Sequence, residues 1–249
     1  MCLRSEWLDQ ELQYRTHVRY YELPEGLESF LQIEGVLTAG VAAPSLTGTV
    51  TRDAGLLDLQ PGRITELVGD PGTGLTRLGL VLLAPYSLQT PVVALDTQGW
   101  ISPGAAWESG VNTDQLVIVR CGEPGLWVKV MASLLEGVRA IYAEVPARIR
   151  DHDLRRLAAL ARTRRVAVAM RAMDGTLPAG IAYLRLRAVG VTWEGADRGH
   201  GRLTRRRLVL EASGKGAFGT TRRFEVEDEG KDAMRVVSDV VVDPVRHTV

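Results

Sequence analysis

Apolar and polar positions along the chain follow two patterns, which change near residue 183. Before that point, short runs rich in apolar and β-branched residues alternate with longer segments whose apolar residues recur at helical spacing. Near-continuous apolar strands that alternate with helices are typical of a parallel sheet covered on both faces, so this part predicts an α/β core. The predicted strands are residues 63–69, 91–96, 115–121, 138–145 and 166–171, and the predicted helices are 74–86, 124–137 and 151–165.

Proline and glycine mark the ends of two of these helices. Pro124 opens one helix and Gly137 closes it, which are the positions that each residue favours. Pro85 is expected to help end the helix at 74–86, because proline has no backbone N–H to continue it. Five apolar residues share one face of the helix at 124–137 and predict its buried side: Trp127, Val130, Met131, Leu134 and Leu135.

The regions on either side of the predicted α/β core have different patterns. From residue 183, alternating segments joined by Gly-rich turns predict an antiparallel β-meander. Ahead of the core, two segments with helical spacing precede a connector rich in Gly, Ala, Pro, Ser and Thr. We therefore expect helices at 5–18 and 26–38 within an N-terminal part at 1–50, a core at 51–228 and a tail at 229–249.

Composition limits the classes of function and location. The chain has 249 residues, 45% of them apolar, and no net charge at pH 7, so its total charge does not attract it to nucleic acid or to anionic membranes. Without a long apolar run, and with a polar N-terminus, the chain is expected to be cytoplasmic. Two cysteines and four scattered histidines fit no ligand spacing, so we predict no metal site.

One motif carries recognisable chemistry. Glycines between a strand and a helix can point successive backbone N–H groups at one anion, beside the positive end of the helix. The usual phosphate loop reads G-x-x-x-x-G-K-[ST], and this chain reads GDPGTGLT from Gly69 to Thr76. Gly69, Gly72 and Gly74 keep the backbone of the loop, and Thr76 stands at the magnesium-ligand position. Leu75, however, replaces the lysine.

The missing lysine at Leu75 affects catalysis more than binding. A charge-assisted hydrogen bond contributes about 1.5–3 kcal/mol, or roughly 10- to 150-fold in affinity, so its loss weakens nucleotide binding without abolishing it. Leucine offers nothing to the charge that develops during phosphoryl transfer, so hydrolysis is compromised. We expect no cofactor, although weak binding of ATP and magnesium and a loop with no ligand at all both remain open.

The order of these segments resembles the RecA-type recombinase core over roughly residues 55–228. The loop segment GRITELVGDPGTGLT, the segment VVALDTQGWISPGAAWESGVNTDQLVIVR and the meander are the parts that carry this resemblance. It implies a RecA-like fold of mostly parallel sheet with a C-terminal antiparallel β-meander. The departures fall on the chemistry: the position of the water-activating glutamate is Gln98, the nearest acid on the magnesium-side strand is Glu144, and Arg171 or a neighbour replaces the nucleotide-sensing glutamine. Because an amide is not a general base, hydrolysis in which a carboxylate activates water is excluded.

A RecA-like chain of this size with an eroded nucleotide site resembles the ImuA family, in its actinobacterial form. The resemblance implies a non-catalytic accessory role in damage-induced translesion synthesis and mutagenesis, in the cytoplasm and at the nucleoid when active. The implied partners are a catalytically inactive Y-family polymerase homologue and an error-prone replicative-type polymerase. Two alternatives remain: a recombinase paralogue that binds nucleotide and modulates a RecA-type filament, and an ATPase that recruits a cation such as Arg77.

Two further features are candidate interaction sites. One is an arginine cluster in a Gly-rich segment, which either contacts the DNA backbone or forms a solvated face; zero net charge and the lack of aromatic residues nearby in the sequence favour the solvated face. Its candidate DNA-contacting residues are Arg202, Arg205, Arg206 and Arg207. The other is a valine-rich tail, which either adds to a partner's sheet or packs on its own domain. Its candidate partner-binding residues are Val236, Val237, Val240, Val241 and Val242. The N-terminal helix could likewise support self-association.

Overall fold

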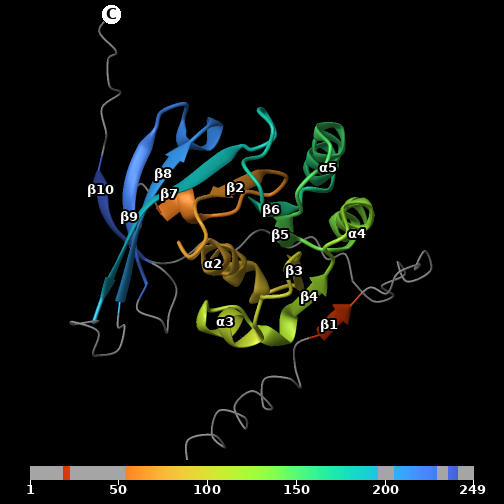
Figure 1. Ribbon diagram of the computed structural model, residues 1–249, viewed down its shortest axis with the longest axis horizontal. Coiled ribbons are helices and arrows are strands. Elements are labelled where there is room, and N and C mark those ends of the chain that lie inside the picture. The colour runs from red at the N-terminus through yellow and green to blue at the C-terminus, as the bar shows by residue number, and fades with distance from the viewer. Residues whose placement is uncertain (1–18, 23–53, 196–204, 229–234, 241–249) are drawn as a thin grey trace, which may run out of the picture.

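A single ten-stranded sheet organises the molecule (Figure 1). The computed structural model describes residues 19–22, 54–195, 205–228 and 235–240. The strand order is β1-β4-β3-β5-β6-β2-β7-β8-β9-β10, so strands that are distant in the sequence lie side by side. The strands are β1 (Arg19–Glu22), β2 (Ile64–Val68), β3 (Val92–Asp96), β4 (Leu116–Arg120), β5 (Ala140–Val145), β6 (Ala167–Ala172), β7 (Leu184–Glu194), β8 (Arg205–Ser213), β9 (Arg222–Asp228) and β10 (Arg235–Val240).

The strands from β1 to β7 in this order pair in parallel, and helices cover both faces of their sheet. One apolar core lies under α2 (Leu75–Ser87) and the short α3 (Pro103–Glu108). The other lies under α4 (Pro124–Gly137) and α5 (Asp151–Arg164), on the opposite face (Figure 1). The expected α/β core of mostly parallel strands is therefore confirmed.

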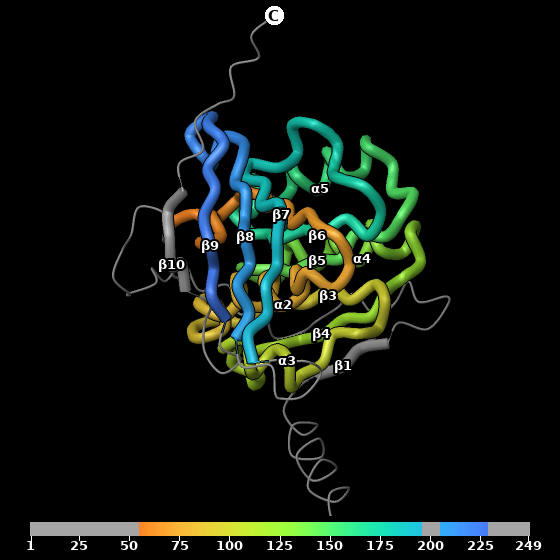
Figure 2. Tube along the Cα trace, turned by 60° about the vertical axis from the view of Figure 1, so that its left-hand side comes forward, coloured from red at the N-terminus to blue at the C-terminus, as the bar shows by residue number. Residues whose placement is uncertain are grey.

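The C-terminal half of the sheet is antiparallel, which confirms the predicted β-meander. Strands β7, β8 and β9 run next to one another in Figure 2, and β10 pairs antiparallel with the outer edge of β9. Three short 3-10 helices complete the described elements: η1 (Ala54–Leu57), η2 (Thr113–Gln115) and η3 (Lys215–Ala217).

The valine-rich tail adds a strand to the chain's own sheet. Val236, Val237 and Val240 lie in β10, while Val241 and Val242 lie outside the described residues. Residues 235–240 of the tail thus pair with the chain's own sheet, and the partner-binding role of these valines stays a prediction.

The helix predictions hold for the core, with one correction. The five apolar residues expected on the inner face of α4 are all buried. Pro85 does not end its helix: it lies inside α2, which continues to Ser87, because a missing N–H removes a single bond near the last turn. The helices expected at 5–18 and 26–38 lie outside the described residues, and the strand β1 between them was not predicted.

A buried carboxylate in β2 shows how polar groups are accommodated in the sheet. Glu66 has no solvent exposure, yet its two oxygens accept hydrogen bonds from Leu177 N at 2.6 Å and from Arg185 Nε at 2.7 Å. Because Arg185 is the register partner of Glu66 on β7, the pair joins the parallel core to the meander.

The contact between α2 and β5 generates a stability prediction. A Cβ added at Gly79 would collide with the ring of the fully buried Tyr142, whereas a Cβ at Gly137, in α4, would meet nothing within 4 Å. Alanine favours a helix over glycine by up to about 1 kcal/mol, but overpacking a core costs about 1–3 kcal/mol. We expect Gly79→Ala to lower the free energy of unfolding and Gly137→Ala to raise it or leave it unchanged, as measured by urea denaturation. Equal effects at the two positions would contradict this packing.

Candidate functional site

The strand β2, the loop at residues 69–74 and the start of α2 form the architecture of a phosphate loop. Gly72 and Gly74 have φ of 84° and 83°, a left-handed conformation that favours glycine. The Thr73 hydroxyl donates to the Asp70 carbonyl at 2.7 Å and tightens the turn. The glycines therefore shape the loop backbone as the sequence predicts.

Leu75 does not occupy the position of a lysine that faces a ligand. It is 1% exposed and belongs to the apolar core under α2. Its Cδ1 lies 3.3 Å from the point where a Cβ on Gly69 would be, so the side chain packs underneath the loop. The substitution has turned this position into a core position.

Thr76, at the magnesium-ligand position, is bonded to a cation from the chain itself. Arg171, near the end of β6, donates from Nη1 to Thr76 Oγ1 at 2.9 Å. Arg171 is buried, and its guanidinium also lies 6.0 Å from the ring centre of Trp100. A divalent cation at the hydroxyl of Thr76 would meet this positive charge, so the arrangement does not suit magnesium.

The two carboxylates at this edge of the sheet are also engaged within the chain. Asp96, at the end of β3, accepts from the backbone N–H groups of residues 98–101 at 2.7–3.3 Å. Glu144 accepts from Trp100 Nε1 at 2.7 Å and from Thr97 N at 3.2 Å. Burial raises the pKa of Glu144. Gln98, at the position of the water-activating glutamate, is exposed and offers no base.

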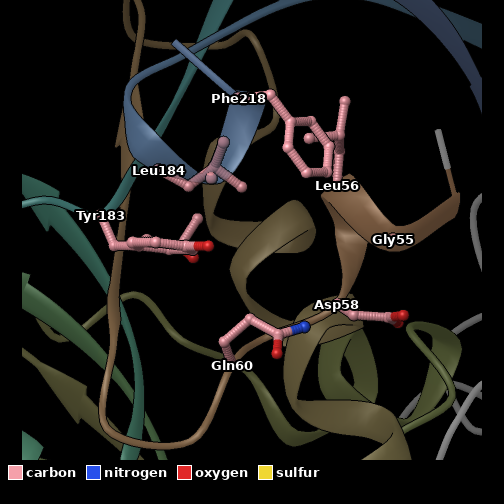
Figure 3. A pocket seen from close by; sticks show the side chains of 9 residues that line it. Gly55, Leu56, Asp58, Gln60, Tyr183, Leu184 and Phe218 are labelled. Carbon is pink, nitrogen blue, oxygen red and sulfur yellow. The ribbon is translucent and has the colours of Figure 1, made fainter.

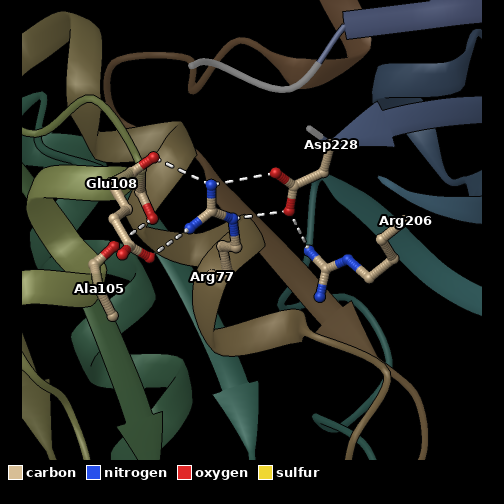
Figure 4. Close-up of polar contacts among 6 residues, drawn as sticks. Arg77, Ala105, Glu108, Arg206 and Asp228 are labelled. Carbon is tan, nitrogen blue, oxygen red and sulfur yellow. Dashed lines mark hydrogen bonds and ion pairs between the residues drawn. The ribbon is translucent and has the colours of Figure 1, made fainter. Parts of the chain in front are cut away.

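Two arginines and one aspartate form a cluster over the first turn of α2 (Figure 4). Asp228, at the end of β9, accepts from Arg77 Nε at 2.6 Å and Nη2 at 3.0 Å. The same carboxylate accepts from Arg206 Nη2 at 2.8 Å. Arg77 also donates to the Glu108 carbonyl at 2.9 Å, which ties in the end of α3. We call Arg77, Arg206 and Asp228 the arginine clamp.

Arg206 lies directly on the phosphate loop. A Cβ at Gly74 would collide with its Nη1, so only glycine fits there. Arg206 is 5% exposed, and its guanidinium lies 5.5 Å from the ring centre of Trp193, its register partner on β7. Burial lowers the pKa of Arg206 and the Asp228 charge opposes that shift. A guanidinium supplied by the meander therefore stands beside the backbone that would otherwise hold a phosphate.

The predicted DNA-contacting arginines are paired with acids. Arg205 lies 3.1 Å from Glu227 and 3.4 Å from Glu194. Arg207 lies 3.5 Å from Glu227 and 3.7 Å from Glu194. These contacts offset the positive charge that DNA phosphates would need.

DNA contact by Arg206 stays a prediction, and the structure places this residue buried in the clamp rather than on an open face. Arg202 lies outside the described residues. An aromatic neighbour, Trp193, was missed because it is thirteen positions away in sequence and adjacent only through strand pairing.

Sequence reasoning also missed the partners of the loop. Arg77 was recognised as the nearest cation, but its partner Asp228 is 151 residues further along the chain. Asp228 lies in the acidic run EVEDE at 225–229, which gives no local sign that two of its acids, Glu227 and Asp228, are buried. The residues described by the structure contain no cluster of three potential metal ligands, and none of the described helices is long and apolar enough to cross a membrane.

Comparisons with known proteins give a family match to part of the chain and a structural neighbour. Residues 55–175, just under half of the chain, match the family described as MT3502 N-terminal domain. No curated protein sequence matches. Among solved structures, the RadB recombinase is similar with 18% sequence identity and a TM-score of 0.48, and the match covers 71% of this chain and 93% of that one.

The arginine clamp generates a stability prediction. Asp228→Ala would leave two buried or half-buried guanidinium groups without their shared carboxylate, and breaking a buried ion pair costs about 3–5 kcal/mol. Asp151→Ala removes the exposed pair with Arg155, which contributes at most about 1 kcal/mol. We expect the first change alone to lower the denaturation midpoint strongly. A clamp that contributes little would give similar midpoints for both variants.

Proposed function

We propose that this chain is a non-catalytic accessory protein of translesion DNA synthesis, in which the α/β core acts as a scaffold for other proteins. The observation that carries the proposal is that two of the chain's own arginines lie against its phosphate loop and its magnesium-ligand position. Arg206 lies against Gly74, and Arg171 is bonded to Thr76. The positions that would contact phosphate and magnesium are therefore part of the fold.

Nucleotide binding at this loop would have to displace internal contacts. A phosphate that took the space beside Gly74 would displace Arg206, and that displacement would leave Asp228 with only part of its pairing. If that move costs about 3–5 kcal/mol, as breaking a buried pair does, affinity falls by about 10²- to 10⁴-fold. A site that would otherwise bind in the micromolar range would then bind in the millimolar range or weaker.

Catalysis is disfavoured independently of affinity. Gln98 cannot accept a proton from water, Leu75 is buried in the core, and Asp96 and Glu144 accept hydrogen bonds from backbone and side-chain donors of the chain. A retained framework with no base, no lysine and no open magnesium position supports a protein that works by binding.

The choice of partners rests on the resemblance to the ImuA family. By that resemblance, the scaffold binds a catalytically inactive Y-family polymerase homologue and an error-prone replicative-type polymerase. Ion pairing of Arg205 and Arg207 with Glu194 and Glu227 supports protein rather than DNA as the primary ligand.

A titration with a fluorescent ATP analogue and magnesium tests the non-catalytic part of the proposal. We expect no saturation up to millimolar analogue with the native chain. We expect no rescue by Leu75→Lys, because position 75 faces the core. Micromolar binding that Thr76→Ala weakens would overturn this proposal and favour a nucleotide-binding recombinase mediator.

A pairwise pull-down tests the partner assignment. The purified chain is mixed separately with the Y-family polymerase homologue, the error-prone polymerase and a RecA-type recombinase from the same cell. Retention of the polymerase homologue in the absence of DNA is the expected result. Retention of the recombinase alone would contradict the translesion assignment, whatever the nucleotide titration shows.

A further inference from the structure

A small hollow lies at the edge of the sheet where β2 and β7 begin, opposite the phosphate loop (Figure 3). Its volume is about 170 Å³, and residues from η1, from the start of β7 and from the η3 turn line it. In Figure 3, Phe218 and Leu56 stand on one side, Tyr183 and Leu184 on another, and Asp58 and Gln60 below them. This volume is too small for a nucleotide or a drug-sized ligand and suits one or two peptide side chains.

Phe218 is the most unusual residue of this hollow. Its side chain is 84% exposed, the highest value among the exposed large hydrophobic residues of the described chain. Its backbone has φ 57° and ψ 28°, a left-handed conformation that aromatic residues seldom adopt. Neither burial nor backbone preference explains a phenylalanine at this position, and such a combination points to a binding role.

The other walls of the hollow are held rigidly. Tyr183 immediately precedes β7, and the Arg63 guanidinium stacks on its ring at 4.9 Å from the ring centre. The hydroxyl of Tyr86, in α2, donates to the Leu59 carbonyl at 2.8 Å and fixes the segment that carries Asp58. Burial, followed by the charge of Asp58, raises the pKa of Tyr86 to about 12.

Asp58 supplies a negative charge at this hollow. Its carboxylate is partly buried, and burial raises its pKa. The described residues provide it with no hydrogen bond and no ion pair, so a cation from outside them would complement it. A ligand that combines an apolar side chain with an adjacent cation therefore matches the hollow.

The strand β10 leads the chain toward this hollow. Val240, its last residue, pairs with Arg223 in an antiparallel register, and Phe218 precedes Arg223 by five residues. The residues that follow Val240 read VVDPVRHTV, which places Val245 five residues and Arg246 six residues beyond the strand. Five extended residues span about 17 Å, and the η3 turn that carries Phe218 lies at the same end of the sheet as Val240, because β9 begins there.

We propose that the hollow is a peptide-binding site and that its occupant is the segment 241–249 of the same chain, with Val245 against Phe218 and Tyr183 and Arg246 beside Asp58. The apolar side chain fills the small volume, and the guanidinium pairs with the carboxylate. A partner protein with the same apolar-then-cationic sequence would compete with this segment for the site.

A competition experiment on the full chain tests the proposal. A tethered segment acts at an effective concentration near millimolar, so it should block a free peptide of the same sequence. The probe is a fluorescein-labelled peptide of residues 241–249, followed by fluorescence anisotropy. We expect the full chain carrying Val245→Ser and Arg246→Glu to bind this probe at least tenfold more tightly than the native chain does.

Matched variants locate the binding site. In the chain with the altered tail, Phe218→Ala should weaken probe binding at least tenfold. Leu88→Ala should not change it, since Leu88 is 70% exposed but does not line the hollow. Asp58→Asn should weaken binding of the native probe and leave a probe with Gln in place of Arg246 unaffected. Because Phe218 and Leu88 are both exposed, we expect both alanine variants to fold. Thermal unfolding of each variant checks this expectation.

Three outcomes would overturn the proposal. The first is that the probe fails to saturate the altered-tail chain at concentrations up to about 1 mM. This limit equals the effective concentration of a tethered segment, which is in the millimolar range. The second is an equal effect of Phe218→Ala and Leu88→Ala. The third is a dimer in light scattering of the native chain that disappears with Val245→Ser, which would assign the segment to a second copy.

Discussion

The pairing of Arg77 and Arg206 with Asp228 is the interaction on which the arrangement of this molecule depends. It joins the first turn of α2, the start of β8 and the end of β9. These three segments are distant in the sequence and meet only in the folded structure. A carboxylate that is buried needs positive partners, and two buried or half-buried arginines need a shared negative charge. Gly74 is required for the same reason, because any side chain there would displace Arg206.

The arginine clamp gives the phosphate loop a structural role in joining the core to the meander. Its glycines still give the backbone the conformation that binds phosphate, yet a guanidinium of the chain lies beside them. Arg171 similarly donates a hydrogen bond to the hydroxyl of Thr76, and Leu75 is buried in the apolar core. The loop is a joint between the parallel core and the antiparallel meander.

The two edges of the parallel sheet therefore differ in character. At the carboxyl edge, the charged groups of Asp96, Glu144 and Arg171 form strong hydrogen bonds within the chain. At the amino edge, an exposed aromatic residue in a left-handed conformation, two apolar walls and a half-buried carboxylate surround an open hollow. Interaction with peptides fits the second edge, where the chain leaves binding groups unsatisfied.

The sequence by itself determined the α/β core, the antiparallel meander and the inner face of α4, because hydrophobic periodicity reflects which side of an element is buried. It also located the loop and the loss of its lysine, since both are local patterns. The partners of the loop were decided by tertiary structure alone: Asp228 is 151 residues from Arg77, and Arg206 reaches Gly74 through strand pairing. The hollow at Phe218 has the same origin, because it is built from four separate segments that carry no common pattern.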